Sequence, residues 1–539
     1  MSPEVLTGET VHGEVVGRVL EHALDGAHDD VTLEERVHET IYAEERRLAN
    51  QPHDPRFPAD RAFVSQLRHD LAHRAEGELS PLLRRIVDRY ATEIGGHFAP
   101  RVYGVATRML PAGLGALLHG SAAPHDGFFA VDDRVLLAGE TQTLRDLASV
   151  GTVILAPTHV SNLDSLLTGY AIHRLGLPPF AYGAGLNLFT SPVVGYFMQH
   201  LGAYTVDRKK TDPLYRDTLR EYATTLLARG QHNLFFPGGT RARSGAIEGH
   251  LKMGLLGTAP IAFRRALEAN AERPRVFVVP CTLTYPLVLE ASSLVQDWLR
   301  TEGGPHYVDL HDEFEHPRRW LEFIRGLGEL DLHIHVRFGR PLDVVGNEVD
   351  GAGVSHDPHG REVDPARYFM VSGRLVEDTA RDAEYTRGLA SRLVDAYRRD
   401  TVALPTSVVA FACFERLRAA RKHLDLFRFL RALGPCDGVP LDDIVEDVGT
   451  LRDELERLAA RGAVQLSADL RESPPADVVA RALATFATYH PTPVALLRDG
   501  KVCVGDANLL FYYRNRLDGY GLGGRAGLFG ETGLARGQS

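Results

Sequence analysis

The chain has 539 residues, of which 44% are hydrophobic and 24% charged, so it has ample apolar material for a folded core. Its formal net charge is −11 at pH 7, so no global basic field points to nucleic acid, and any anion site must come from a local cluster of cations. Four scattered cysteines without a Cys-x2-Cys pair argue against a zinc knuckle or a disulfide framework and fit a reducing cytosol.

The N-terminal part, residues 1 to about 120, is predicted to be helical. Thr32 to Glu35 matches a capping box and predicts a helix that ends near residue 49. Ser80 followed by Pro81 predicts a second helix start, and paired glycines at 95 and 96 predict its end. The apolar segment 108–118 is short and broken by glycine. A buried helix or turn is its favoured interpretation, and contact with a bilayer surface is the alternative.

Nothing in the sequence predicts a segment that crosses a membrane. The N-terminus lacks a basic region followed by an apolar run, so we expect no signal peptide. No window approaches the ~18 apolar residues that a membrane span requires. Any membrane role is therefore expected to be peripheral.

From about residue 130 the pattern changes to alternating strands and helices, which is typical of a largely parallel sheet with crossover helices. Helices are expected between most of the strands, notably at 214–228 and 256–270. The block closes near residue 343, and residues 344–367 are interpreted as a polar linker or loop insertion. The predicted strands are 134–137, 152–156, 180–183, 203–206, 232–236, 276–279 and 333–338.

The chain becomes helical again after about residue 367. An apolar run at 408–414 has only seven residues, so we interpret it as core and not as a membrane span. The predicted helices are 367–399, 405–424, 441–461 and 477–489.

The most informative stretch is 152–167. An apolar run predicts a buried strand that ends at Pro157, and His159 and Asp164 follow it at the spacing His-x4-Asp. Ser161 is the expected N-cap of the next helix. Asp164 would then lie near enough to bond one imidazole nitrogen of His159 and fix its tautomer. The other nitrogen would be left to take a proton from a hydroxyl.

The same spacing occurs a second time, at His359 and Asp364, within a polar run that contains glycine and proline. No apolar strand precedes this copy, so we interpret it as loop. The bare spacing is therefore a weak signal, and the preceding strand distinguishes the two copies.

Three further stretches lie at predicted strand ends in the same α/β block. Residues 202–210 form a strand that opens onto three cations, 235–245 form a strand followed by a Gly-rich turn with two arginines, and 278–285 form a strand that ends at Pro280. Considered one at a time, each stretch has an ordinary structural explanation: solvated cations after a strand for 202–210, a turn for 235–245 and the end of a strand for 278–285. Because ligands in open α/β sheets bind beyond the carboxyl ends of the strands, all four stretches are expected to converge on one site.

These four stretches, in this order, resemble the four motifs of the glycerolipid acyltransferases, which acylate glycerol phosphates from acyl-CoA or acyl-carrier protein. Residues 510–515 also resemble a C-terminal Tyr-Arg-Asn segment of the large bacterial glycerol-3-phosphate acyltransferases and their dihydroxyacetone-phosphate relatives. The motif resemblance spans about 150–290. The matching residues are His159 and Asp164 (His-x4-Asp), 202–208 (Gly-Ala-Phe-Phe-Ile-Arg-Arg-like), 236–242 (Phe-Pro-Glu-Gly-Thr-Arg-Ser-like) and Val279 with Pro280.

The resemblance implies transfer of a fatty acyl group from an acyl thioester to the hydroxyl of glycerol 3-phosphate, without a covalent intermediate, metal or cofactor. His159 would be the general base, Asp164 would hold its other nitrogen, and backbone N–H groups around 238–239 would stabilise the oxyanion. The implied partners are the acyl thioester, the phosphorylated acceptor and a membrane surface. The implied substrate-binding residues are Arg208, Lys209, Gly239, Thr240, Arg241, Arg243 and Pro280.

Two residues depart from the family pattern. Gly238 stands where the third motif has glutamate, and Asp207 occupies the first arginine position of the second motif. Glu248, ten residues after Gly238, is a candidate substitute in space. Three alternatives stay open: a lysophosphatidate acyltransferase, a degenerate member that binds acyl chains or lipid without turnover, and a thioesterase-like hydrolase.

The predicted architecture is an α/β acyltransferase domain with a mostly parallel sheet, flanked by helical regions. Its expected bounds are 1–125 for the N-terminal helical region, 126–345 for the α/β domain and 346–539 for the mainly helical C-terminal region. The expected location is the cytoplasm, peripherally associated with the inner face of the cell membrane. Acyl-chain length, the choice between the two donors and the oligomeric state are left open by the sequence.

Overall fold

The computed structural model describes residues 8–25, 30–50, 57–73, 79–96, 98–105, 134–186, 200–303 and 332–523. The helical N-terminal region is confirmed by α1 (Gly8–Asp25), α2 (Asp30–Asn50), α3 (Phe57–Ala72) and α4 (Leu79–Ile94). Helices α2 and α4 begin before Thr32 and Ser80, so these two residues lie inside the first turns and are not the N-caps that the sequence predicts. The apolar segment 108–118 lies outside the described residues.

A seven-stranded sheet in the order β1-β7-β6-β2-β5-β3-β4 forms the centre of the chain. Five of its six pairs of neighbouring strands are parallel, and only β6 with β7 is antiparallel, so the predicted mostly parallel sheet is confirmed. All seven predicted strands are present. They are β1 (Val135–Gly139), β2 (Thr152–Pro157), β3 (Ala181–Gly185), β4 (Ala203–Val206), β5 (Asn233–Leu234), β6 (Val276–Thr284) and β7 (Ile334–Phe338).

Both faces of the sheet are covered by helices, which explains the unbroken apolar run of β2. Val153 and Leu155 belong to one buried cluster and Ile154 and Ala156 to another, because successive side chains of a strand point to opposite faces. The first cluster includes side chains of α8 (Asp164–Arg174) and α13 (Ala291–Gly303). The second includes side chains of α12 (Thr258–Glu268) and α15 (Thr379–Asp400).

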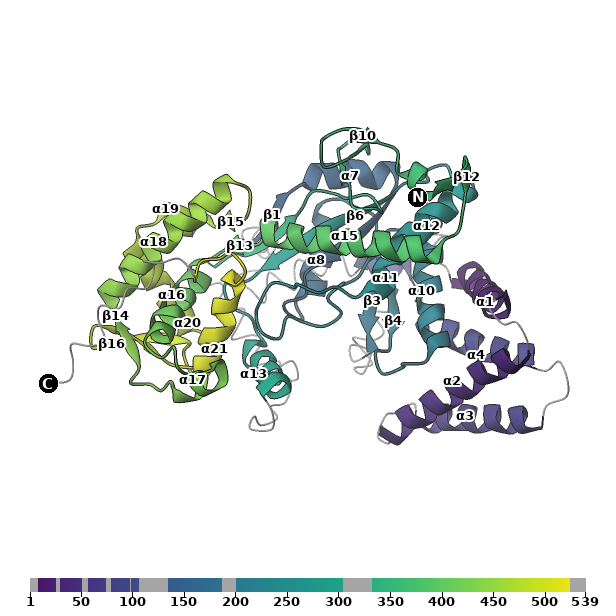
Figure 1. The fold of residues 1–539 in the computed structure, drawn as a ribbon, viewed down its shortest axis with the longest axis horizontal. Helices are drawn as coiled ribbons and strands as arrows, with labels where there is room; N and C mark the ends of the chain where they lie inside the picture. Colours follow the sequence, from purple (N-terminus) through teal and green to yellow (C-terminus); the bar gives the residue numbers. More distant parts are fainter. Residues whose placement is uncertain are drawn as a thin grey trace.

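The N-terminal helices pack through α10 (Pro213–Ala228) against the β3–β4 end of the sheet. Asp212 caps α10 by accepting a hydrogen bond from the backbone N–H of Tyr215, and Pro213 occupies the first helical turn. Figure 1 shows these helices on one side of the sheet and the C-terminal helices on the other.

The polar segment predicted as linker or loop contains three short antiparallel strands, β8 (Glu348–Val349), β9 (Ser355–His356) and β10 (Glu362–Val363). The helix predicted to start at 367 starts at Thr379, because η4 (Pro365–Phe369) and a hairpin of β11 (Met370–Val371) and β12 (Arg374–Leu375) precede it. Helix α15 shares its buried cluster with the sheet, although the predicted boundary at 345 assigns it to the C-terminal region. The domain bounds therefore stay predictions.

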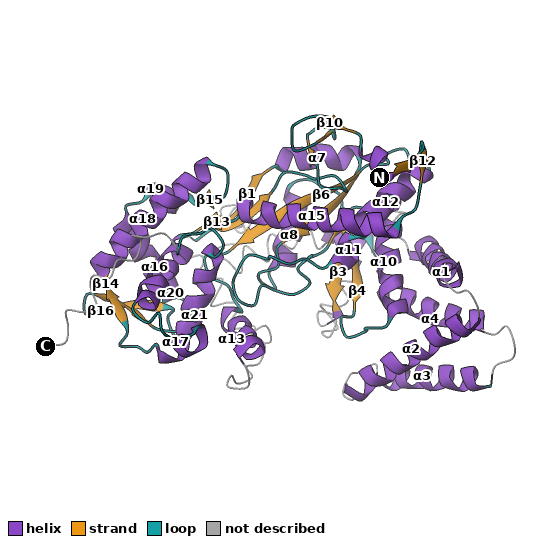
Figure 2. Cartoon of the chain, viewed as in Figure 1, coloured by secondary structure: helices purple, strands orange, loops and turns teal. Residues whose placement is uncertain are grey.

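The C-terminal region mixes helices with short strands, as the colours of Figure 2 show. No helix within the described ranges has both the length and the apolar character needed to cross a bilayer. The helices are α16 (Pro405–Ala419), α17 (Leu426–Ala432), α18 (Leu441–Ala460), α19 (Ala468–Glu472), α20 (Pro475–Phe486), α21 (Ala507–Arg514) and η5 (Asn515–Leu517), and the strands are β13 (Val402–Ala403), β14 (Gly438–Pro440), β15 (Gln465–Leu466), β16 (Ala495–Arg498) and β17 (Lys501–Val504).

Candidate active site

His159 and Asp164 meet at the carboxyl end of β2, as the sequence predicts. The Nδ1 atom of His159 lies 2.9 Å from Oδ2 of Asp164, which fixes the imidazole orientation. The His159 side chain keeps 14% of its surface exposed, whereas Asp164 is fully buried. No hydrogen bond to Nε2 of His159 occurs among the described residues, so this nitrogen is placed to accept a proton from a ligand.

Asp164 is held by donors from two separate parts of the chain. Its Oδ2 accepts hydrogen bonds from the backbone N–H groups of Val160 and Ser161, at 2.5 and 2.9 Å. Its Oδ1 accepts from the hydroxyl of Tyr285, which follows the end of β6. The carboxylate is therefore fixed before any substrate binds. Tyr285 is a site residue that the sequence did not single out.

Ser161 does not cap the helix that follows, because α8 begins at Asp164 and has Leu163 at its N-cap position. The Ser161 hydroxyl instead donates to Oε2 of Glu290 at 2.8 Å, and the backbone N–H of Asn162 donates to Oε1 at 2.9 Å. Burial raises the pKa of Glu290, and the nearby charge of Arg241 opposes this shift. Glu290 thus ties the His159 turn to the third motif, a role that no local pattern around residue 290 revealed.

Arg241 and Arg208 form the cationic side of the site. Arg241 lies 3.5 Å from Glu290, with 21% of its side chain exposed. Partial desolvation and, after it, the positive charge of Arg241 lower the pKa of Arg208. Two guanidinium groups that raise each other's electrostatic energy are stabilised when an anion binds between them.

The rest of the second motif shapes the turn that carries Arg208. Asp207 is buried and accepts a hydrogen bond from the backbone N–H of Lys209 at 3.0 Å, so its carboxylate closes the turn. Lys209 is exposed beside Arg208. Lys210 points away into the N-terminal helices, where it bonds Glu93 at 2.5 Å.

The third-motif turn differs in part from its predicted role. The backbone N–H of Gly239 donates to the carbonyl of Phe236 at 3.0 Å, so in this conformation it is not available as the predicted oxyanion donor. Thr240 is exposed next to it. Arg243 reaches outward to Asp297 of α13, with Nη1 at 2.9 Å from Oδ2. The assignment of Thr240 and Arg243 to substrate stays a prediction.

Pro280 does not end its strand, contrary to the prediction. Strand β6 continues to Thr284, and Pro280 pairs with Ala156 inside the sheet. The strand tolerates this proline because the residue is not required to donate a hydrogen bond there, and its carbonyl accepts from Gly339 at 2.8 Å. Residues beyond the true strand end, Tyr285 among them, reach the site instead.

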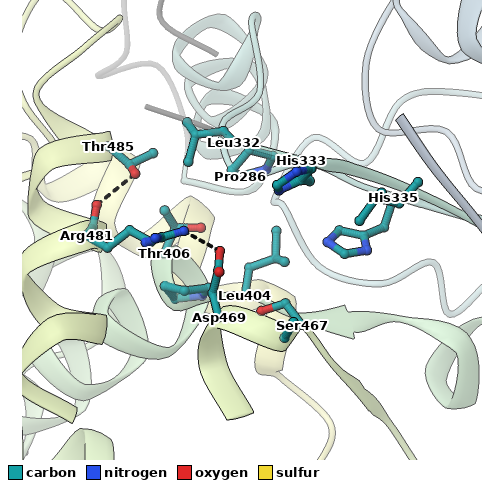
Figure 3. Close-up of a pocket in the computed structure, with 13 residues that line it drawn as sticks. Pro286, Leu332, His333, His335, Leu404, Thr406, Ser467, Asp469, Arg481 and Thr485 are labelled. Atoms are coloured by element: carbon teal, nitrogen blue, oxygen red, sulfur yellow. Dashed lines mark hydrogen bonds and ion pairs between the residues drawn. The ribbon is translucent and has the colours of Figure 1, made fainter. Parts of the chain in front are cut away.

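The cavity drawn in Figure 3, of about 120 Å³, lies between β7 and the C-terminal region. Its lining includes His333, His335 and the ion pair of Asp469 with Arg481, and none of the predicted site residues is part of it within the described ranges. Burial lowers the pKa of His335 to about 4, so this histidine is neutral at physiological pH. The cavity is distinct from the His159 site.

Helix α21 and the start of η5, which together carry the C-terminal Tyr-Arg-Asn segment, pack on the third-motif loop. The side-chain amide of Asn515 donates to the carbonyl of Ser244 at 2.8 Å. A Cβ atom built on Gly245 would lie 2.2 Å from the carbonyl oxygen of Tyr512. The C-terminal region therefore packs directly on the loop that carries the third motif.

Gly245→Ala is expected to loosen this contact and lower the melting temperature. Gly245 has φ +79°, and its missing Cβ is required by the approach of Tyr512, so alanine is both strained and obstructed. Gly249→Ala is the matched control, since Gly249 lies in the same loop with no atom within 4 Å of a built Cβ. Thermal unfolding of both variants checks the prediction. Equal melting temperatures would contradict the docking of α21.

The second His-x4-Asp copy does not form a pair. His359 is exposed, its backbone N–H donates to Asp357, and Asp364 caps η4 by accepting from Ala366. The prediction that this copy is not a site is consistent with this geometry, and the residues provide a control for the first copy.

Comparisons with known proteins show what this region is similar to. Residues 140–284 match the family model described as Acyltransferase. The glycerol-3-phosphate acyltransferase of Pseudomonas putida is 27% identical over 321 residues, which cover 59% of this chain and 35% of that protein. The one from Pseudomonas aeruginosa is 31% identical over 294 residues, 54% of this chain and 31% of that protein. The match therefore spans about a third of the length of these relatives. The predicted resemblance to glycerol-3-phosphate acyltransferases is confirmed.

A solved structure of the 1-acyl-sn-glycerophosphate (LPA) acyltransferase from Thermotoga maritima is also similar, with 14% identity and a TM-score of 0.26. The similarity covers 54% of this chain and 80% of that chain.

Proposed function

We propose, from the premise that residues 140–284 are an acyltransferase-family domain, that this chain transfers a fatty acyl group from an acyl thioester to a hydroxyl of glycerol 3-phosphate. The observation that carries the proposal is the buried Asp164 bonded to Nδ1 of a partly exposed His159, beside the paired cations Arg208 and Arg241. A base next to an anion-binding pair suits an acceptor that carries both a hydroxyl and a phosphate.

The proposed mechanism uses His159 as general base. Its Nε2 takes the proton of the acceptor hydroxyl as the oxygen attacks the thioester carbonyl. The tetrahedral intermediate then collapses, the carbon–sulfur bond breaks, and the thiolate leaves with the proton returned from His159. Asp164 keeps the imidazole in one orientation and stabilises the imidazolium that forms between the two proton transfers. Neither acyl-CoA nor acyl-carrier protein is favoured as donor by the described residues.

The phosphate of the acceptor is proposed to bind between Arg208 and Arg241. Arg241→Gln is therefore expected to raise the KM for glycerol 3-phosphate about 10–100-fold, since a hydrogen bond to a charged group contributes about 1.5–3 kcal/mol. The KM for the acyl thioester should stay the same. Arg387→Gln, an exposed arginine of α15 that pairs with Glu384, is the control. Steady-state kinetics with each substrate varied in turn would contradict the assignment if both KM values rose together.

The decisive experiment is thiol release from palmitoyl-CoA by the purified chain, with and without glycerol 3-phosphate. Acceptor-dependent release supports the proposal. Release that depends on lysophosphatidate alone would replace it with the lysophosphatidate reaction, and release without any acceptor would indicate a thioesterase. A parallel arm with acyl-carrier protein identifies the donor. Absence of release in every arm would favour a lipid-binding protein without turnover.

Association with the inner face of the cell membrane is part of the proposal, because the product keeps its acyl chain and partitions into a bilayer. A flotation assay with anionic vesicles tests it. Recovery of the chain in the vesicle fraction is expected, and recovery only in the bottom fraction would contradict it.

A further inference from the structure

Gly238 lies against the carboxyl group of a residue ten positions away. A Cβ atom built on Gly238 would lie 2.7 Å from Cδ of Glu248 and 2.8 and 3.0 Å from its two oxygens. The backbone at Gly238 is not in the left-handed region, whereas Gly239 has φ +76°. The three described atoms nearest to that Cβ therefore all belong to the Glu248 carboxyl, which stands where a side chain at position 238 would begin.

Glu248 also touches the catalytic turn. Its Oε1 accepts a hydrogen bond from the backbone N–H of His159 at 2.6 Å. Its Oε2 is buried and has no hydrogen-bond partner among the described residues. Burial raises the pKa of Glu248 to about 8, and the hydrogen bond from the His159 backbone N–H opposes this shift more than the charge of Arg516 does. A buried carboxyl that bonds the backbone of the proposed base is placed to fix the position of that base.

The loop between the third motif and α11 (Met253–Leu256) brings Glu248 to this place. The backbone N–H of Lys252 donates to the carbonyl of Pro237 at 2.7 Å, so the loop folds back onto the turn that contains Gly238. The backbone N–H of Ala242 donates to the carbonyl of His159 at 2.7 Å. The His159 turn is thus bonded on both sides by the segment that follows β5.

We propose that Glu248, at the far end of this loop, is a positioning residue. Its carboxyl occupies the space that a side chain at position 238 would fill, and it holds the His159 turn in its reactive position. The part of the inference that concerns reactivity rests on the proposed function. The spatial exchange between positions 238 and 248 does not, and it can be tested without any substrate.

The spatial exchange is tested by a double-mutant cycle on thermal stability. Gly238→Ala alone forces a Cβ into the Glu248 carboxyl and should lower the melting temperature by about 2–4 °C. In the background of Glu248→Ala the same change no longer meets the carboxyl, so its effect on the melting temperature should become clearly smaller. Equal shifts of the melting temperature in both backgrounds would overturn the inference, whatever the chain catalyses.

The positioning role is tested by removing the Glu248 carboxyl and by placing a carboxyl at position 238 instead. Glu248→Gly is expected to lower kcat about 10–100-fold with an unchanged KM for the thioester. Glu248→Gln keeps an acceptor for the His159 N–H and should stay within about threefold of wild type. The exchange Gly238→Glu with Glu248→Gly should recover activity, whereas Gly249→Glu with Glu248→Gly should not, since Gly249 is exposed.

An exchange variant that folds but is as slow as Glu248→Gly would overturn the positioning role. If wild type itself shows no transfer to any acceptor, the proposed function fails instead, and the stability cycle still decides the spatial exchange. The two failures are therefore distinguishable.

Discussion

His159→Ala is expected to lower acyl transfer by about 10²–10⁴-fold, the usual contribution of a general base. The reason is geometric, because His159 is the partly exposed member of a pair whose other member, Asp164, is fully buried. The measurement is the rate of thiol release from palmitoyl-CoA in the presence of glycerol 3-phosphate. The KM values for donor and acceptor should change little, since the imidazole acts on the proton and the cations hold the phosphate.

The second His-x4-Asp copy gives the control for this prediction. His359→Ala changes the same residue type at the same sequence spacing, but His359 is exposed and makes no bond to Asp364 in the described structure. Activity of His359→Ala should equal that of wild type. A His159→Ala variant that kept more than about a tenth of wild-type activity would exclude His159 as the base.

The sheet could be predicted from sequence because the apolar pattern within each strand is sufficient to identify that strand. The run from Val153 to Ala156 is apolar at every position, as expected for a strand that is covered on both faces. The end of strand β6 could not be predicted in this way. A proline in a strand signals an end when only the sequence is known, but Pro280 sits at a position where its missing N–H is not needed, and the strand runs on to Thr284.

The pairing of His159 with Asp164 was predictable for the same reason, since only four residues lie between them and a strand precedes them. The residues that support this pair were not. Tyr285 bonds Asp164, and Glu290 bonds the turn between the pair, each across more than 120 positions, and their neighbours in sequence form an ordinary apolar segment. Such contacts depend on which strand lies next to β2, and the order of the strands is not visible in their individual patterns.

Glu248 is an intermediate case. The sequence identifies it as a candidate because Gly238 leaves a gap in a recognisable pattern, and only the fold shows that its carboxyl lies at that gap. A position that departs from a family pattern is therefore a useful starting point, because another residue can occupy the space of the missing side chain.

Asp164→Asn is expected to lower kcat by about 10²–10⁴-fold while the chain stays folded. The amide keeps the size of the carboxylate, but it places a donor where four donors converge, namely Val160 N–H, Ser161 N–H, the His159 ring and the Tyr285 hydroxyl. The His159 tautomer that leaves Nε2 basic is then no longer favoured. Kinetics at saturating substrates measure the loss, and KM for the acceptor should stay within about threefold of wild type.

Asp164→Ala separates the structural part of this role from the chemical part. It leaves two backbone N–H groups without their acceptor in the protein interior, at a cost of about 1–3 kcal/mol each, so it should lower the melting temperature as well as kcat. Tyr285→Phe removes one donor and keeps the carboxylate, so it should affect both quantities less. If Asp164→Asn kept wild-type kcat, the carboxylate would serve only to hold the turn between β2 and α8, and the orientation of His159 would have to come from Glu248 and from the ring of Phe236, which stacks on it at 4.3 Å.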